Sequence, residues 1–160
     1  MLGHRGSRLA VTAPEIYTMQ LRALFGAMQD VAGPEAATVE IMLPLISTAE
    51  EITRLRQLIE IEAAAWGSTH GFTPEFGIGS MIEVPSAALT ADTLAQALAG
   101  QPGFFSFGTN DLTQTTLGLS RDDAGSFLSD YLGGGLLEAD PFATLAQDSV
   151  GALMQITAEK

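Results

Sequence analysis

The sequence predicts an α/β fold built around a parallel β-sheet. Three short apolar runs, at residues 39–45, 76–82 and 104–107, alternate with longer stretches of helical periodicity. Each run has the length and residue types of a buried parallel strand, and helices between consecutive strands imply crossover connections. The chain has 160 residues, fewer than the roughly 200 to 250 of a complete eight-stranded β/α barrel. From the pattern alone, a small doubly wound sheet and part of a barrel fit equally well.

The helical stretches are defined by their starts and by their apolar spacing. Thr12 is a candidate N-cap for a helix over residues 14–28, with Pro14 in its first turn. A second helix begins at Ser47 or Thr48 and continues to about residue 66, and its opening, with Glu50 and Glu51 after the Ser/Thr pair, resembles a capping box. Further helices are expected at residues 87–98, 122–132 and 141–157.

Composition indicates one acidic globular unit, residues 1–160, without a second domain. The net charge is −12, with one lysine and six arginines spread along the chain, so there is no basic stripe for nucleic acid or an anionic membrane. The absence of cysteine excludes a disulfide framework and a cysteine nucleophile within this chain. No apolar run is long enough for a signal peptide or a membrane span. We therefore expect neither nucleic-acid nor membrane partners, and a cytoplasmic location.

Two acidic positions follow the second and third predicted strands. Glu83 comes directly after residues 76–82, and the third strand runs into Gly108, Thr109, Asn110 and Asp111. Alone, Glu83 could be a solvated loop charge, and Asn110 or Asp111 could cap the next helix. If the two strands are neighbours, however, their ends lie about 5 Å apart. Magnesium takes one or two protein carboxylates, so this pair of residues would suit a shared Mg²⁺.

Arginines are the candidate anion ligands. Arg5, Arg8 and Arg121 make up half of the arginines in the chain. They could form ordinary surface salt bridges, but a guanidinium also offers a planar donor fork for a carboxylate or a phosphate. No Walker-type lysine is present, so ATP binding by this chain is not supported.

Taken together, these motifs resemble the pyruvate, phosphate dikinase family, specifically its C-terminal phosphoenolpyruvate/pyruvate-binding barrel domain. The most specific match is FFSFGTNDLTQ at residues 104–114. The GHRG opening and the SRDDAG segment look more like the dikinase than like the related Enzyme I or phosphoenolpyruvate synthase. The other matching segments, in order, are residues 3–9, 14–16, 40–45, 79–85, 120–125 and 140–142.

The resemblance implies a fold and a set of site residues. The fold would be a partial (β/α)8 TIM barrel of about four βα units with parallel strands and a C-terminal helical segment. In the family, the residues matching Glu83 and Asp111 hold Mg²⁺, and the arginine matching Arg5 binds the phosphate or carboxylate of the substrate. The positions matching Gly108, Thr109 and Asn110 contact substrate, as does the arginine of Enzyme I that matches Arg121.

The resemblance also implies a reaction and what this chain lacks for it. The family transfers a phosphoryl group between a phosphohistidine on a separate domain and the enolate of pyruvate. Its general acid is a cysteine that would lie beyond Lys160, so no catalytic acid is expected here and the isolated chain should be inactive. The expected partners are phosphoenolpyruvate or pyruvate, the rest of the barrel, the phosphohistidine domain and, through exposed strand edges, a second copy.

Two other functions remain open at this point. The chain could be a non-catalytic assembly or regulatory module that uses its half-barrel surface to dock a partner. It could also be an aldolase-like Mg²⁺-enolate enzyme on a similar scaffold, although the absent general acid disfavours that reading.

Overall fold

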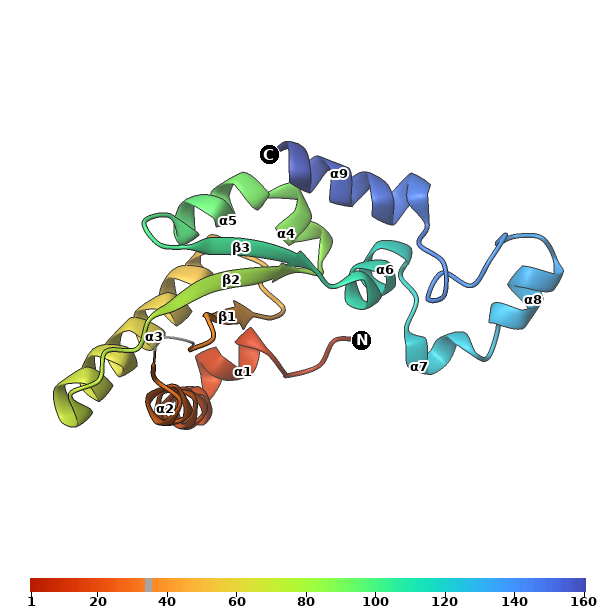
Figure 1. The fold of residues 1–160 in the computed structure, drawn as a ribbon. Helices are drawn as coiled ribbons and strands as arrows, with labels where there is room; N and C mark the ends of the chain where they lie inside the picture. The colour runs from red at the N-terminus through yellow and green to blue at the C-terminus, as the bar shows by residue number, and fades with distance from the viewer. Residues whose placement is uncertain (34–35) are drawn as a thin grey trace.

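A computed structural model describes residues 1–33 and 36–160 (Figure 1). Within this part of the chain, three parallel strands form an open sheet in the order β1-β2-β3. They are β1 (Val39–Leu43), β2 (Phe76–Ile82) and β3 (Gly103–Phe107), and helices connect each strand to the next. The predicted α/β class and parallel sheet are confirmed. The described residues hold three strands where about four βα units were expected, because residues 118–146 contain no β-branched apolar run and form short helices and loops.

Helices cover one face of the sheet. The main ones are α2 (Pro14–Asp30), α3 (Ala49–His70) and α5 (Ala91–Leu98). The strand residues on this face belong to one core cluster with the apolar sides of these helices, and they include Ile41, Leu43, Ile78, Ile82 and Phe105.

The other face of the sheet carries the alternate strand residues. These include Met42, Met81 and Phe104, which lie outside the core cluster. Gly79 is required here because a Cβ at this position would lie 2.5 Å from the ring of Phe104. The helices thus pack against the side of the sheet that carries Ile41, Ile78 and Phe105, and Met42, Met81 and Phe104 take no part in this core.

The predicted capping box at the start of α3 is confirmed. Thr48 is the N-cap, and its hydroxyl accepts a hydrogen bond from the Glu51 N–H at 3.4 Å. The Glu51 carboxylate accepts in return from the Thr48 N–H at 3.0 Å. The helix continues to His70, four residues past the expected end, and stops at Gly71, which has a φ of +68°.

Several predicted helices are shorter than expected. The stretch at 87–98 is divided into α4 (Pro85–Leu89) and α5 at Thr90, whose φ of −118° and ψ of 25° depart from the helical values. The stretch at 122–132 forms α7 (Arg121–Ala124) and α8 (Leu128–Gly133). The stretch at 141–157 contains a π-helical turn, η1 (Gln147–Gly151), followed by α9 (Ala152–Glu159).

Two helices were not predicted, namely α1 (Ser7–Thr12) and α6 (Thr109–Leu117). Thr12 therefore ends α1, and Ala13 occupies the N-cap position of α2 that Thr12 was expected to fill. The N-terminal segment and α6 both lie at the carboxyl ends of the strands, and α7 and α8 extend from there away from the sheet (Figure 1). None of the helices in the described residues is long and apolar enough to cross a membrane.

Candidate functional site

Glu83 is buried immediately after β2 and is held by the backbone at the end of β1. Glu83 is only 5% exposed. The Glu83 Oε1 accepts a hydrogen bond of 2.6 Å from the N–H of Leu45. Leu45 has a φ of 53° and is the only non-glycine residue with a positive φ in the described chain. The loop after β1 thus donates a backbone N–H to the residue that follows β2, so the two loops meet at Glu83.

The N-terminal segment is fastened to the same point. The Ser7 hydroxyl donates to the Leu45 carbonyl at 2.8 Å, and the Ser7 N–H donates to the Pro44 carbonyl at 3.2 Å. Ser7 is fully buried. The start of α1 is therefore fixed against the end of β1, and this placement brings Arg5 to the carboxyl ends of the strands.

Asp111 lies in the first turn of α6 and is 6% exposed. Its Oδ2 accepts from the Arg5 Nη2 at 2.5 Å, a contact between residues 106 positions apart. Its Oδ1 accepts from the Gln114 Nε2 at 2.8 Å. Both carboxylate oxygens of Asp111 thus have a donor, while the Arg5 side chain itself is 53% exposed.

Gly108 makes the close approach of these groups possible. Its N–H donates to the Ile82 carbonyl at 3.0 Å, which continues the pairing of β3 with β2. A Cβ built on Gly108 would lie 2.6 Å from the Glu83 Oε2 and 2.7 Å from the Met81 sulfur. Only glycine leaves room for the Glu83 carboxylate beside the start of α6.

Burial raises the pKa of Glu83 above its ordinary value, and the negative charge of Asp111 raises it further. The hydrogen bond from the Leu45 backbone and the charge of Arg5 act in the opposite direction but do not cancel the effect. Two carboxylates therefore share a buried position with one arginine. This arrangement favours the binding of an additional cation.

The residues present fit Mg²⁺. Glu83 and Asp111 supply two hard oxygen ligands, which is the number of protein carboxylates that Mg²⁺ commonly takes. Among the described residues there is no group of three or more histidine, aspartate or glutamate side chains that could hold a metal. The rest of the magnesium shell would consist of water and ligand oxygens, as is usual for this ion.

The other predicted site residues are less buried than Glu83 and Asp111. Thr109 and Asn110 are exposed at the start of α6, beside Asp111. Arg121 begins α7 with an exposed side chain, and its backbone N–H donates to the Gln114 Oε1 at 2.7 Å. Arg8 donates to the Gly3 carbonyl at 3.0 Å, within its own segment.

Sequence reasoning missed Leu45 and Gln114. Gln114 is three positions after Asp111, a spacing that places both on one side of a helix once α6 is recognised. The residue type of Leu45 does not indicate its role, because Leu45 contacts Glu83 and Ser7 through its backbone N–H and carbonyl.

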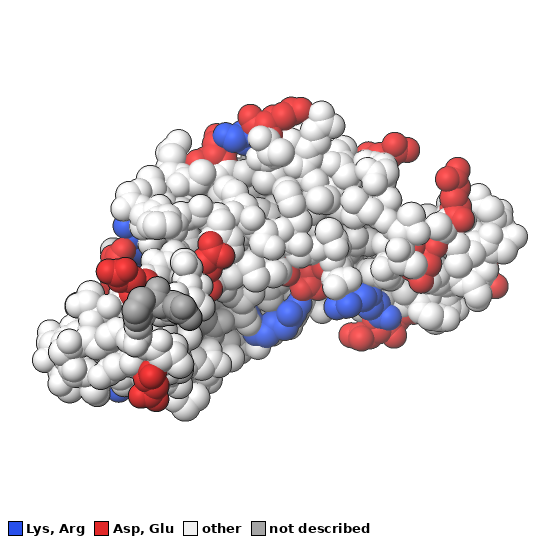
Figure 2. Space-filling view, viewed as in Figure 1, with Lys and Arg blue, Asp and Glu red and all other residues white. Residues whose placement is uncertain are grey.

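Basic side chains are few in this acidic chain. In Figure 2 the basic side chains form only a few small groups on the visible face, among more numerous acidic ones. In a chain of net charge −12, an anionic ligand requires local positive charge. Arg5 supplies such a charge next to Asp111.

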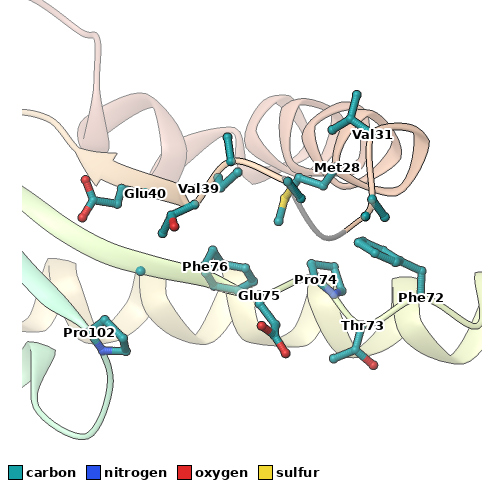
Figure 3. A pocket seen from close by; sticks show the side chains of 16 residues that line it. Met28, Val31, Val39, Glu40, Phe72, Thr73, Pro74, Glu75, Phe76 and Pro102 are labelled. Carbon is teal, nitrogen blue, oxygen red and sulfur yellow. The ribbon is translucent and has the colours of Figure 1, made fainter.

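A separate cavity of about 850 Å³ lies where β1 and β2 begin, at the opposite edge of the sheet from Glu83 (Figure 3). Its lining is mostly apolar and includes Met28, Phe72 and Phe76, with the carboxylates of Glu40 and Glu75 at its border. In parallel α/β sheets, binding sites form at the carboxyl ends of the strands. The carboxylate pair, rather than this cavity, is therefore the candidate site.

Comparison with known proteins identifies the family. The model of the PEP-utilising enzyme family, PEP-binding domain, matches residues 1–160. The chain is 49% identical to pyruvate, phosphate dikinase of Rhizobium meliloti (strain 1021), over 100% of its own length and 18% of that protein. It is 45% identical to the pyruvate, phosphate dikinases of Giardia intestinalis and Clostridium symbiosum, covering 99% and 100% of this chain and 18% of each relative.

Similar relatives also include chloroplastic dikinases of plants. A cytoplasmic location therefore stays a prediction. The chain spans about a fifth of the length of these curated relatives. With a family model matched from its first residue to its last and these identities, the chain belongs to the PEP-utilising enzymes and corresponds to their PEP-binding domain.

Proposed function

We propose that this chain forms the part of a pyruvate, phosphate dikinase that binds Mg²⁺ together with phosphoenolpyruvate or pyruvate. The observation that carries the proposal is the convergence of Glu83, Asp111 and Arg5 at the carboxyl ends of neighbouring strands. Two buried carboxylates suit a divalent cation, and a half-exposed arginine beside them suits an anionic ligand. The names of the relatives supply the substrate class.

Each side chain has a proposed role in binding. Glu83 and Asp111 would hold the metal, and Mg²⁺, when bound, would supply positive charge to the enolate oxygen of pyruvate. Arg5 donates to Asp111 through Nη2 and to the Leu2 carbonyl through Nε, which leaves Nη1 of its exposed guanidinium for a phosphate or carboxylate. Gly108, Thr109 and Asn110 would present backbone N–H and side-chain groups to the substrate from the start of α6, with Arg121 as a second cation.

The proposed reaction is a phosphoryl transfer. The N–P bond of a phosphohistidine breaks as the enolate oxygen of pyruvate forms an O–P bond, giving phosphoenolpyruvate and a neutral histidine. Positioning and electrostatic stabilisation carry most of the catalysis in such transfers. The phosphohistidine and the general acid that protonates the enolate in the reverse direction would come from elsewhere, since this chain has no cysteine. We expect no ATP-dependent turnover by the 160 residues alone.

The sheet supports the proposal of a partial barrel. Its helices lie on one face, as they do around a (β/α)8 barrel, and Met42, Met81 and Phe104 occupy the face that would point inward. Further strands would complete the wall beside β1 and β3.

Calorimetric titration of oxalate, which mimics the enolate of pyruvate, tests the proposed function. Oxalate should bind in the presence of MgCl₂ and not in its absence, and binding should be lost in Glu83→Ala and in Asp111→Ala. Glu75→Ala is the matched control, because Glu75 is an exposed carboxylate at the opposite edge of the sheet. Failure of the unmodified chain to bind oxalate under either condition would contradict the proposal.

The second candidate is an assembly or regulatory module. It is favoured by the open sheet, in which β1 and β3 each pair with a single strand of the described residues, and by Met42, which is 39% exposed. Analytical ultracentrifugation separates the two functions. A dimer that is insensitive to Mg²⁺, in a chain that does not bind oxalate, would favour the module.

A further inference from the structure

Gln114 connects Asp111 and Arg121, two residues of the candidate site that are not neighbours in the sequence. It lies on α6, one turn after Asp111, and is 6% exposed. Its Nε2 donates to the Asp111 Oδ1 at 2.8 Å, and its Oε1 accepts from the backbone N–H of Arg121 at 2.7 Å. Both ends of this buried amide are therefore engaged.

The contact with Arg121 replaces a missing helix cap. Ser120 is the N-cap of α7, and its side chain makes no capping hydrogen bond. The first N–H groups of a helix have no partner within the helix, and here the Gln114 amide oxygen satisfies the first of them.

The backbone of Gln114 holds the same segment. Its carbonyl accepts from the Leu119 N–H at 3.0 Å, across a turn in which Gly118 has a φ of +67°. One residue thus fixes where the chain leaves α6 and where α7 begins.

The contact with Asp111 fixes the orientation of a carboxylate. The hydrogen bond is charge-assisted and buried, so it is stronger than one between neutral groups. Because Arg5 holds the other oxygen, the Asp111 carboxylate cannot rotate without breaking one of two hydrogen bonds. Groups that orient a metal-binding carboxylate in this way influence metal affinity without touching the metal.

We propose that Gln114 is a positioning residue that sets Asp111 and the backbone of Arg121 at the start of α7 in a fixed relation, so that Arg121 keeps a fixed place relative to a ligand of the metal that Asp111 would hold. The hydrogen-bonded frame is a property of the chain itself. Its consequence for ligand binding rests on the proposed function, and the two parts are tested separately.

The frame is tested without ligand, by amide hydrogen exchange followed by NMR. In the unmodified chain the Arg121 amide should be protected, and in Gln114→Leu its exchange should be faster by about tenfold or more. Gln114→Glu keeps an acceptor for this N–H but loses the donor to Asp111, so it should retain more of the protection than Gln114→Leu. In Asp111→Ala the side-chain amide protons of Gln114 should exchange faster than in the unmodified chain.

A buried Thr→Val substitution elsewhere controls for general destabilisation. Thr157, 6% exposed on α9, donates to the Leu153 carbonyl at 2.9 Å, and Thr157→Val should leave the Arg121 amide protected. Equal exchange of the Arg121 amide in Gln114→Leu and in the unmodified chain would overturn the proposal.

The consequence for binding is tested by a double-mutant cycle on Mg²⁺-dependent oxalate titration. Gln114→Leu should weaken oxalate binding by about tenfold. Combined with Arg121→Met, the same substitution should weaken binding by a clearly smaller factor, because part of its effect is carried by Arg121. Equal factors in both backgrounds would show that Gln114 does not act through Arg121.

If the unmodified chain binds no oxalate, the proposed function fails and the exchange measurement alone decides whether Gln114 holds Arg121 and Asp111.

Discussion

Substitution of Gly108 by alanine tests whether the Glu83 carboxylate is held where the structure places it. Gly108 has a φ of −87° and a ψ of 77°, which alanine can adopt, so the backbone conformation does not oppose the change. The new Cβ would lie 2.6 Å from the Glu83 Oε2, about 0.8 Å short of the 3.4 Å at which ordinary contact begins. It would also lie 2.7 Å from the Glu83 Cβ and from the Met81 sulfur.

Relief of this overlap requires movement of buried atoms. The Glu83 Oε1 is hydrogen-bonded to the Leu45 N–H, so the side chain cannot retreat without stretching that bond. Overpacking of this kind costs about 1–3 kcal/mol, and we expect the free energy of unfolding of Gly108→Ala to fall by this amount in urea titrations followed by circular dichroism. A displaced Glu83 should also weaken Mg²⁺-dependent oxalate binding by about tenfold or more.

Gly125→Ala is the matched control. Gly125 has a helical φ of −56° and ψ of −20°, and a Cβ there would have no atom within 4 Å. This variant should retain the stability and the oxalate affinity of the unmodified chain. Unchanged stability and affinity in Gly108→Ala would refute the reasoning, because they would mean that the Glu83 carboxylate does not lie against Gly108.

Three further substitutions address electrostatics and folding. Burial raises the pKa of Glu83 above 4.5, so protonation of this residue contributes stability that is present below about pH 4.5 and is lost as the pH rises through the raised value. In urea titrations without Mg²⁺, Glu83→Gln should therefore be more stable than the unmodified chain at pH 7. This advantage should disappear at low pH. Arg5→Met should lower stability by about 1–3 kcal/mol, since it leaves one oxygen of the buried Asp111 carboxylate without its donor, and should weaken oxalate binding by about tenfold. Arg22→Met, which removes an exposed arginine paired with Glu62, should leave calorimetric binding unchanged. Thr48→Ala should lower the free energy of unfolding by about 1 kcal/mol through loss of the α3 cap, with no effect on oxalate affinity, and an unaltered urea midpoint would contradict the capping role.

The elements that could be predicted from sequence are those with strong local signals. The three strands were found because each is a short apolar run, and the start of α3 was found because Thr48 and Glu51 have the spacing of a capping box. The meeting of Glu83 and Asp111 follows from neighbouring parallel strands, a relation that chain order suggested and the register confirms. Their role in metal binding remains a proposal.

The elements that could not be predicted depend on contacts between distant segments. α1 is only six residues long and is held by the buried contacts of Ser7 with Pro44 and Leu45, which no local pattern reveals. The stretch at 87–98 was expected to be one helix because it is rich in alanine and leucine, but the backbone leaves the helical conformation at Thr90. α6 was missed because its polar opening, Gly108 to Asp111, is equally typical of a turn.

The arrangement of the site also explains how a strongly acidic chain could bind an anion. The positive charge shown at Asp111 comes from Arg5, and the position of Arg5 depends on the attachment of α1 to Leu45, whose N–H in turn holds Glu83. Arg5 and the Glu83 carboxylate are therefore positioned by the same residue, Leu45. A cation bound by Glu83 and Asp111 would neutralise negative charge that Arg5 alone now offsets. The Arg5 guanidinium would then be more available to an anion. Because such coupling is reciprocal, Mg²⁺ should raise oxalate affinity by the same factor by which oxalate raises Mg²⁺ affinity. Disruption of the Ser7 contact with Leu45 should reduce both affinities together, although Ser7 contacts neither ligand in this proposal.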